Sequence, residues 1–314
     1  MSVTVGIVLQ QQDIERHGRS LGPLTASIVD AGIDRVTVGD HVSFEHGRGA
    51  DGLIQATALL SSHPTLSVQT GVYLIVLRHP ATVARQLATL CSIAPGRLSF
   101  GVGLGGDDRR ELELCGVDPR TRGARMNEAL ELLIRFLSGD PVDFAGRFFD
   151  IHDAAIRPAP VPRPPVIVGG RSDAAIARAG RLGDGWIGVW VSPQRFAEAT
   201  RKVAEAAAVH GRERVEWNHA LQLWAGFGSD RAAGRARVAT AMQRSYQLPF
   251  ERFERYVPCG TPEDVAGSLV PYLACGCRHF NIVPEGYDLE HSIEAIASVR
   301  PRLLRFDAAT PDDA

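Results

Sequence analysis

The feature that most constrains the fold of this chain is a regular spacing of short apolar runs. The first four runs begin at residues 3, 35, 66 and 98, so each follows the previous one by 31 or 32 residues. This spacing accommodates one strand, one helix and two short loops, which together make a βα unit. Eight such runs occur along the chain, at 3–9, 35–39, 66–72, 98–103, 166–169, 185–190, 220–227 and 278–283.

Apolar residues between the runs recur at helical spacing. One stripe with intervals of i, i+4, i+7, i+8 and i+11 consists of Val83, Leu87, Leu90, Cys91 and Ala94. Gly96 follows it, where a left-handed residue ends a helix. The run at 166–168 is continuously apolar, as in strands that are buried on both faces of a parallel sheet. Eight units of this kind predict an α/β fold, a (β/α)₈ TIM barrel, formed by a single domain over residues 1–314.

Two stretches interrupt this rhythm and predict insertions after the fourth and seventh strands. Residues 140–165 contain a possible hairpin at 142–150, followed by five prolines within 158–165, which is typical of an extended strap. Residues 230–261 begin with a helical pattern and continue through Pro249 and Phe250. Long insertions on barrels often form lids over the pocket.

The composition excludes several classes of function. The chain has 34 basic and 36 acidic residues, and its formal net charge is therefore −2. It lacks the excess of positive charge that is typical of proteins that bind nucleic acid or an anionic membrane surface. The apolar N-terminal run has no basic residues ahead of it and is too short to span a membrane. Five cysteines in 314 residues form neither a disulfide framework nor paired zinc spacings. We therefore expect a cytoplasmic protein without a metal, acting on a small molecule.

In a barrel of this kind the active site forms at the carboxyl ends of the strands. The second run ends with Asp40 and His41. An aspartate beside a histidine can form a carboxylate-oriented imidazole suited to proton transfer near neutral pH. The alternative is that Asp40 caps a turn and His41 is solvated.

Glycines follow the third and fourth runs. Gly71 precedes the β-branched Val72, which is typical of a bulge or of a close approach of the backbone to another group. The fourth run leads into Gly103, Gly105 and Gly106, and the segment 101–106 formally matches the dinucleotide-binding G-x-G-x-x-G. The expected acidic residue after a further strand is missing, because a long helix occupies that interval. We favour the interpretation that these glycines keep the loop free of bulky side chains so that a flat ring can bind there.

The fifth run ends with Gly169, Gly170 and Arg171 in front of a helix. Backbone N–H groups at a helix N-terminus, next to an arginine, favour binding of an anion such as phosphate. Simple capping by Ser172 is the alternative. Trp190 and Trp224 lie at the carboxyl ends of the sixth and seventh predicted strands, and they either pack in the core or form the wall of an apolar substrate pocket.

Six segments of the first 190 residues, in this order and spacing, resemble the luciferase-like monooxygenase superfamily of flavin and deazaflavin oxidoreductases. They lie at 31–42, 78–90, 95–103, 123–130, 164–170 and 182–186. The Gly-Asp-His sequence at 39–41 resembles the branch that uses the deazaflavin coenzyme F420, in which this histidine lies beside the reactive ring carbon.

The resemblance implies roles for the residues singled out above. Gly71 and Val72, joined by a cis peptide bond, would support the F420 ring together with the backbone of Gly103, Gly105 and Gly106. Gly169, Gly170 and Arg171 would hold the phosphate. Asp40 would orient His41, which would act as the general acid or base while hydride moves at the ring. The family is commonly homodimeric.

One departure from the family pattern concerns the substrate. Relatives that act on sugars carry a glutamate directly after Gly-x-Gly, whereas here Gly105 and Gly106 precede Asp107, which argues against a sugar. Two other functions stay open: an FMN-dependent monooxygenase that activates O₂, and a flavin-binding protein without catalysis.

Overall fold

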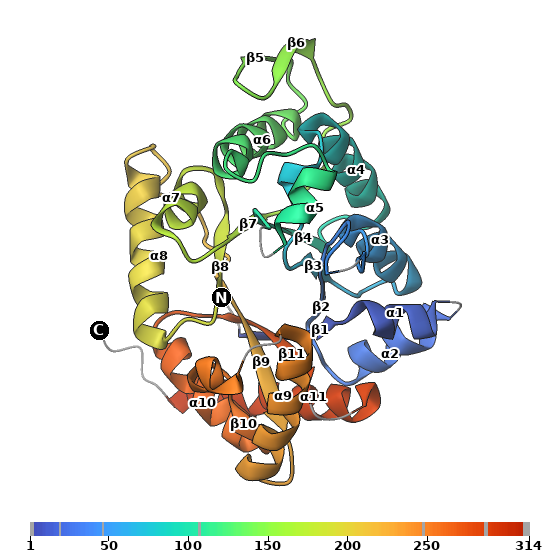
Figure 1. Cartoon of the computed structure of the whole chain (residues 1–314), viewed down its shortest axis with the longest axis vertical. Helices are drawn as coiled ribbons and strands as arrows, with labels where there is room; N and C mark the ends of the chain where they lie inside the picture. Colours follow the sequence, from blue (N-terminus) through green and yellow to red (C-terminus); the bar gives the residue numbers. More distant parts are fainter. Residues whose placement is uncertain are drawn as a thin grey trace.

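Eight parallel strands form a closed barrel, and the helices surround it (Figure 1). The computed structural model describes residues 3–18, 20–45, 47–105, 108–246, 249–285 and 288–309, with only the backbone for 244–246 and 307–309. The barrel strands are β1 (Thr4–Leu9), β2 (Arg35–Val38), β3 (Val68–Thr70), β4 (Leu98–Val102), β7 (Val166–Gly169), β8 (Gly185–Val189), β9 (Ala220–Phe227) and β11 (His279–Glu285). Each predicted run contributes one strand, and the pairing of β8 with β9 closes the ring. The predicted TIM barrel is confirmed.

Helices follow the strands and surround the barrel (Figure 1). They are α1 (Gln11–His17), α2 (Leu21–Asp30), α3 (Gly52–Ser62), α4 (Pro80–Ile93), α5 (Arg109–Leu114), α6 (Arg122–Phe136), α7 (Asp173–Leu182), α8 (Pro193–Ala208), α9 (Arg231–Tyr246), α10 (Pro262–Ala274) and α11 (Leu289–Ala309), with short 3₁₀ turns η1 (Ile75–Leu77), η2 (Phe250–Arg252) and η3 (Glu254–Tyr256). The predicted stripe of α4 is buried, and Gly96 adopts a φ of +72° just after the helix. Among the described helices, none has the length and apolarity needed to cross a membrane.

The side chains of each barrel strand point alternately into two cores. Odd and even residues of a barrel strand point to opposite faces, so one set packs under the helices and the other fills the barrel. The outer set is apolar and buried, as in Val36 and Val38 of β2 or Phe280 and Ile282 of β11. This arrangement explains why the strands read as apolar runs in the sequence.

Both predicted insertions are present. The first contains the antiparallel hairpin of β5 (Val142–Ala145) and β6 (Asp150–Ala154), which projects from the barrel beside α6 (Figure 1). The second consists of α9, the turns η2 and η3, and the short strand β10 (Cys259–Gly260), which pairs with the carboxyl end of β9. This insertion therefore lies at the end of the barrel where an active site is expected.

Candidate active site

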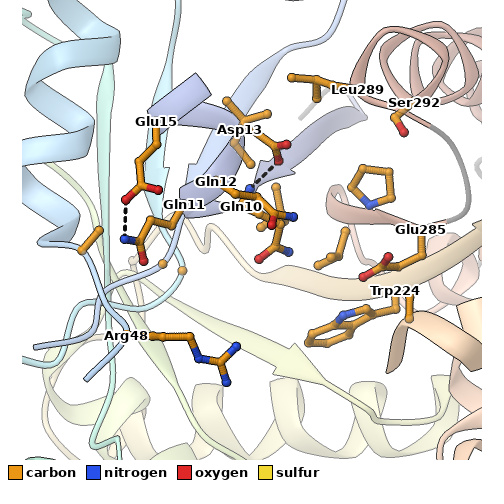
Figure 2. Close-up of a pocket in the computed structure, with 18 of the residues that line it drawn as sticks. Gln10, Gln11, Gln12, Asp13, Glu15, Arg48, Trp224, Glu285, Leu289 and Ser292 are labelled. Atoms are coloured by element: carbon orange, nitrogen blue, oxygen red, sulfur yellow. Dashed lines mark hydrogen bonds between the residues drawn. The ribbon is translucent and has the colours of Figure 1, made fainter. Parts of the chain in front are cut away.

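A cavity of about 1230 Å³ opens at the carboxyl ends of the strands. It is lined by residues at the ends of β1, β2, β3, β9 and β11 and by α1, α9 and α11. Gln10, Gln11, Gln12 and Arg48 lie on one side, and Trp224 and Glu285 on the other (Figure 2). Asp40, His41, Gly71 and Trp224 are the predicted site residues among its lining.

His41 is held by a carboxylate that sequence reasoning missed. Its Nδ1 lies 3.1 Å from Oε2 and 3.3 Å from Oε1 of Glu111, and its ring packs on Phe44 with 4.5 Å between the centroids. Because Nδ1 bonds to a carboxylate, this nitrogen carries the proton and Nε2 is left for a ligand. The His41 side chain is 38% exposed, which makes it accessible from the cavity that it lines.

Glu111 also fixes the loop that carries His41. Its side chain is 2% exposed, and Oε1 accepts hydrogen bonds from the backbone N–H of Val42 at 2.7 Å and of Ser43 at 3.1 Å. Burial raises the pKa of the Glu111 carboxyl, but the hydrogen bonds from His41 and from these two amides outweigh burial and lower it below its usual value. The carboxylate is therefore ionised when it faces His41.

Asp40 does not orient His41, so that prediction is wrong. The Asp40 carboxylate accepts hydrogen bonds from the backbone N–H of Gly52 at 2.9 Å and of Leu74 at 2.8 Å. Arg78 binds both of its oxygens, with Nη2 at 2.9 Å from Oδ1. Burial raises the pKa of Asp40, and the charge of Arg78 acts in the opposite direction. Asp40 is thus a structural anchor that ties the end of β2 to α3 and to the segment after β3.

Neither Glu111 nor Arg78 could be linked to its partner from spacing alone. Glu111 lies 70 residues from His41, on a short helix that follows β4. Arg78 lies within a segment that carries the family resemblance. Its pairing with Asp40, 38 residues away, depends on how the two loops fold together.

The predicted cis peptide bond between Gly71 and Val72 is present. Val72 turns its side chain into the barrel, where a Cβ on Gly103 would lie 2.4 Å, and one on Gly169 2.9 Å, from its methyl groups. These two glycines therefore make room for Val72. Of the predicted ring cradle, Gly71 lines the cavity, whereas Val72, Gly103 and Gly105 do not, and Gly106 lies outside the described residues.

The predicted anion site lies at the N-terminus of α7. Gly170 has a φ of +127°, and a Cβ there would approach Ala175 to 2.8 Å, so only glycine suits this turn. Arg171 is exposed, with its guanidinium carbon 5.8 Å from the centre of the Trp190 ring. Ser172 caps the helix by accepting a hydrogen bond from the N–H of Ala175, so the capping alternative holds for this residue. None of Gly169, Gly170 and Arg171 lines the cavity described above.

The side chains around this helix end carry both signs of charge. Asp173, in the first turn of α7, pairs with Arg195 and with Lys202, each at 3.3 Å. Glu198 pairs with the same two cations, at 3.0 Å and 2.9 Å. These four charges balance, so Arg171 adds one positive charge at the N-terminus of the helix. A positive charge beside the free N–H groups of a helix is a suitable environment for a phosphate group.

The two tryptophans predicted for the pocket are brought together. Their ring centroids are 5.0 Å apart, and Trp190 also contacts Phe253 of the second insertion at 4.6 Å. Trp224 lines the cavity, and the tilted ring of Trp190 packs against it, beneath Arg171. The second insertion therefore packs against the aromatic wall of the cavity.

Sequence comparison finds relatives that match over most of the chain. The chain is 26% identical over 309 residues to the F420-dependent glucose-6-phosphate dehydrogenase of Kineococcus radiotolerans, which covers 88% of this chain and 90% of that protein. It is 31% identical over 240 residues to the F420-dependent hydroxymycolic acid dehydrogenase of Mycobacterium tuberculosis, covering 74% of this chain and 65% of that protein.

Comparison with solved structures finds the same fold. An F420-dependent secondary alcohol dehydrogenase in complex with an F420–acetone adduct superposes with a TM-score of 0.80 at 21% identity, covering 96% of this chain and 99% of the other. The monooxygenase RslO1 from Streptomyces bottropensis also has a TM-score of 0.80, at 20% identity and the same coverage. The sequence model of the luciferase-like monooxygenase family matches residues 10–259. The chain belongs to the luciferase-like monooxygenase family.

Proposed function

We propose that this protein is an oxidoreductase that binds coenzyme F420 and transfers hydride between the coenzyme and a small organic substrate, with His41 as general acid or base. The observation that carries the proposal is the position of His41, which lines the cavity while Glu111 holds its Nδ1. Relatives that cover most of the chain are named F420-dependent dehydrogenases, and this supports F420 as the cofactor.

A flat ring with a phosphate-bearing side chain would use two parts of this end of the barrel. Gly71 presents bare backbone to the cavity, and a Cβ there would lie 2.5 Å from Thr37 Cγ2. The anion site formed by Gly170, Arg171 and the N-terminus of α7 would hold the phosphate. When bound, F420 supplies a ring carbon that accepts or donates hydride.

The remaining chemistry belongs to the protein. Conversion between an alcohol and a carbonyl compound moves one proton at the substrate oxygen in addition to the hydride. The Nε2 of His41 would accept the hydroxyl proton, or return it in the reverse direction, because imidazole is suited to this transfer near neutral pH. Glu111 would stabilise the charged imidazole and keep its tautomer, and Trp224 would form the wall of the substrate pocket.

We further propose that the chain forms a single domain over residues 1–314, is a homodimer and has a cytoplasmic location, as the sequence and the family resemblance suggest. An FMN-dependent monooxygenase is the alternative function, and it would use the same end of the barrel. Flavin binding without catalysis is the third candidate.

The experiment is a comparison of wild type with His41→Ala. F420 would be mixed with each protein and a panel of secondary alcohols, long-chain hydroxy lipids and hexose phosphates, and its reduction followed by absorbance. The variant should bind F420 within about threefold of wild type, while turnover falls by about 10²–10⁴-fold. Full turnover in the variant would show that His41 is not the general acid or base. If wild type binds F420 but turns over none of the compounds, the non-catalytic alternative would be favoured.

A further inference from the structure

The interior of the barrel has a polar half and an apolar half. Strands β7 and β8 point Ile167 and Ile187 inward, as expected for a packed barrel core. The strands β1, β2, β3, β9 and β11 instead point polar side chains inward. These are Thr4, Arg35, Thr37, Gln69, Gln222, His279 and Asn281.

Gln222 is the member of this polar set that reaches the cavity. Of the seven residues, all within the described part of the chain, it alone contributes to the lining. Trp224 lies two residues further along β9 and therefore points to the same side, one layer closer to the mouth. Gln222 thus forms part of the cavity floor, and Trp224 forms part of the wall above it.

The amide of Gln222 lies against Gly71. A Cβ on Gly71 would be only 2.7 Å from Gln222 Oε1, so the glycine leaves space for this amide. Oε1 is buried, and no described residue donates a hydrogen bond to it. A buried acceptor without a donor costs about 1–3 kcal/mol, so residues of this kind normally meet a partner that arrives with a ligand or with water.

We propose that Gln222 is a cofactor-binding residue whose amide recognises the polar edge of the heterocyclic ring at the cavity floor. The ring systems of F420 and of FMN both carry an N–H group beside ring carbonyls. A primary amide offers one donor and one acceptor side by side, which matches such an edge. This inference depends on the proposed function, since it requires that the ring occupy this cavity.

The test measures F420 binding directly, without a substrate. Dissociation constants would be determined by fluorescence titration for wild type, Gln222→Leu and Gln222→Met, and the absorbance spectrum of the bound coenzyme recorded for each. Gln86→Leu serves as the matched control, because Gln86 is an exposed glutamine on α4 that does not line the cavity. Thermal unfolding of the apoproteins reports on the fold.

We expect both Gln222 variants to bind F420 at least tenfold more weakly and to lose part of the spectral shift of the bound coenzyme. Their unfolding temperatures should equal or exceed that of wild type, since an apolar side chain leaves no unmet acceptor. Gln86→Leu should bind F420 like wild type. Unchanged affinity and spectrum in the Gln222 variants would overturn the inference, as would a large loss of thermal stability with unchanged affinity. If wild type does not bind F420, the proposed function is contradicted, and the role of Gln222 in binding this coenzyme is contradicted with it.

Discussion

Glu111 reaches across from the βα unit of β4 to place a carboxylate oxygen 3.1 Å from Nδ1 of His41, a residue of the second unit. The same carboxylate holds the amides of Val42 and Ser43, so one buried side chain sets both the imidazole and its loop. Glu111 is therefore a positioning residue, and its effect on a reaction would pass through His41.

This relationship predicts different outcomes for two substitutions of Glu111. In Glu111→Gln the amide oxygen can still accept from Val42 and Ser43, so stability and F420 affinity should stay near wild type, while kcat falls at least tenfold because the charged imidazole loses its counterion. In Glu111→Ala the two amides lose their acceptor, and the free energy of unfolding should fall by about 1–3 kcal/mol as well. Urea unfolding and steady-state kinetics measure these effects. Equal kcat in Glu111→Gln and wild type would contradict the positioning role.

The packing of Val72 predicts a coupled pair of substitutions. Gly103→Ala places a methyl group 2.4 Å from Val72 Cγ2 and should destabilise the protein by about 1–3 kcal/mol. Val72→Ala removes the conflicting atoms, so Gly103→Ala should cost much less in that background. A double-mutant cycle by urea unfolding measures the coupling.

The control for this cycle is Gly123→Ala, since nothing lies within 4 Å of a Cβ at that helical position. It should be neutral or slightly stabilising. If Gly103→Ala costs as much in the Val72→Ala background as in wild type, the two residues are not in contact as described.

The buried ion pair of Asp40 predicts a large loss of stability on neutralisation. Asp40→Asn leaves Arg78 without its buried counterion, and removing one partner of a buried pair costs about 3–5 kcal/mol. Asp51→Asn is the matched control, because Asp51 also binds Arg78, at 3.0 Å, but is 30% exposed. Asparagine still caps α3, so this change should cost less than about 1 kcal/mol. Similar losses in the two variants would contradict the role of Asp40 as an anchor.

Two histidines, the buried His279 and the half-buried His219, predict loss of stability in mild acid. Burial lowers the pKa of His219 to about 4, and burial with the nearby charge of Arg35 lowers the pKa of His279 to about 4. Both have a pKa near 6.5 when unfolded, so the unfolded chain binds more protons as pH falls below that value. Their contribution to stability is fully present above about pH 6.5 and is lost as pH falls toward 4.

Each histidine should therefore reduce the free energy of unfolding by about 2 kcal/mol between pH 7 and pH 5. Urea unfolding at a series of pH values measures this slope. His219→Gln should lower stability at pH 7, because Nδ1 accepts a hydrogen bond from the N–H of Trp186, but it should flatten the slope. An unchanged slope in His219→Gln would show that His219 is not buried in its neutral form.

The barrel was predictable because its signals are local. The 31–32 residue spacing and the apolar outer faces of the strands are visible in the sequence, and all eight strands follow from them. Strand β3 ends at Thr70, earlier than the predicted run, because the chain turns at Gly71 and Val72. The positions of His41 and Trp224 in the cavity also follow, since strand ends of a barrel meet at one rim.

The pairings between residues far apart were not predictable in the same way. The partner of His41 is 70 residues away, and the adjacent Asp40 is the more obvious candidate until the loops are seen together. Gly103 and Gly169 are predicted to contact the cofactor, yet they make room for Val72 of the segment after β3. Sequence spacing gives the direction of a side chain, whereas its contacts depend on the three-dimensional arrangement of the strands.

The cofactor preference of the purified protein tests the proposed function most directly. F420 and FMN would each be titrated into the wild-type protein under identical conditions and their dissociation constants compared. We predict saturable F420 binding that is at least tenfold tighter than FMN binding, with affinity for F420 reduced in Arg171→Glu, which reverses the charge of an exposed side chain at the anion site. Tight binding of FMN with no binding of F420 would contradict this prediction and the function proposed for the cavity.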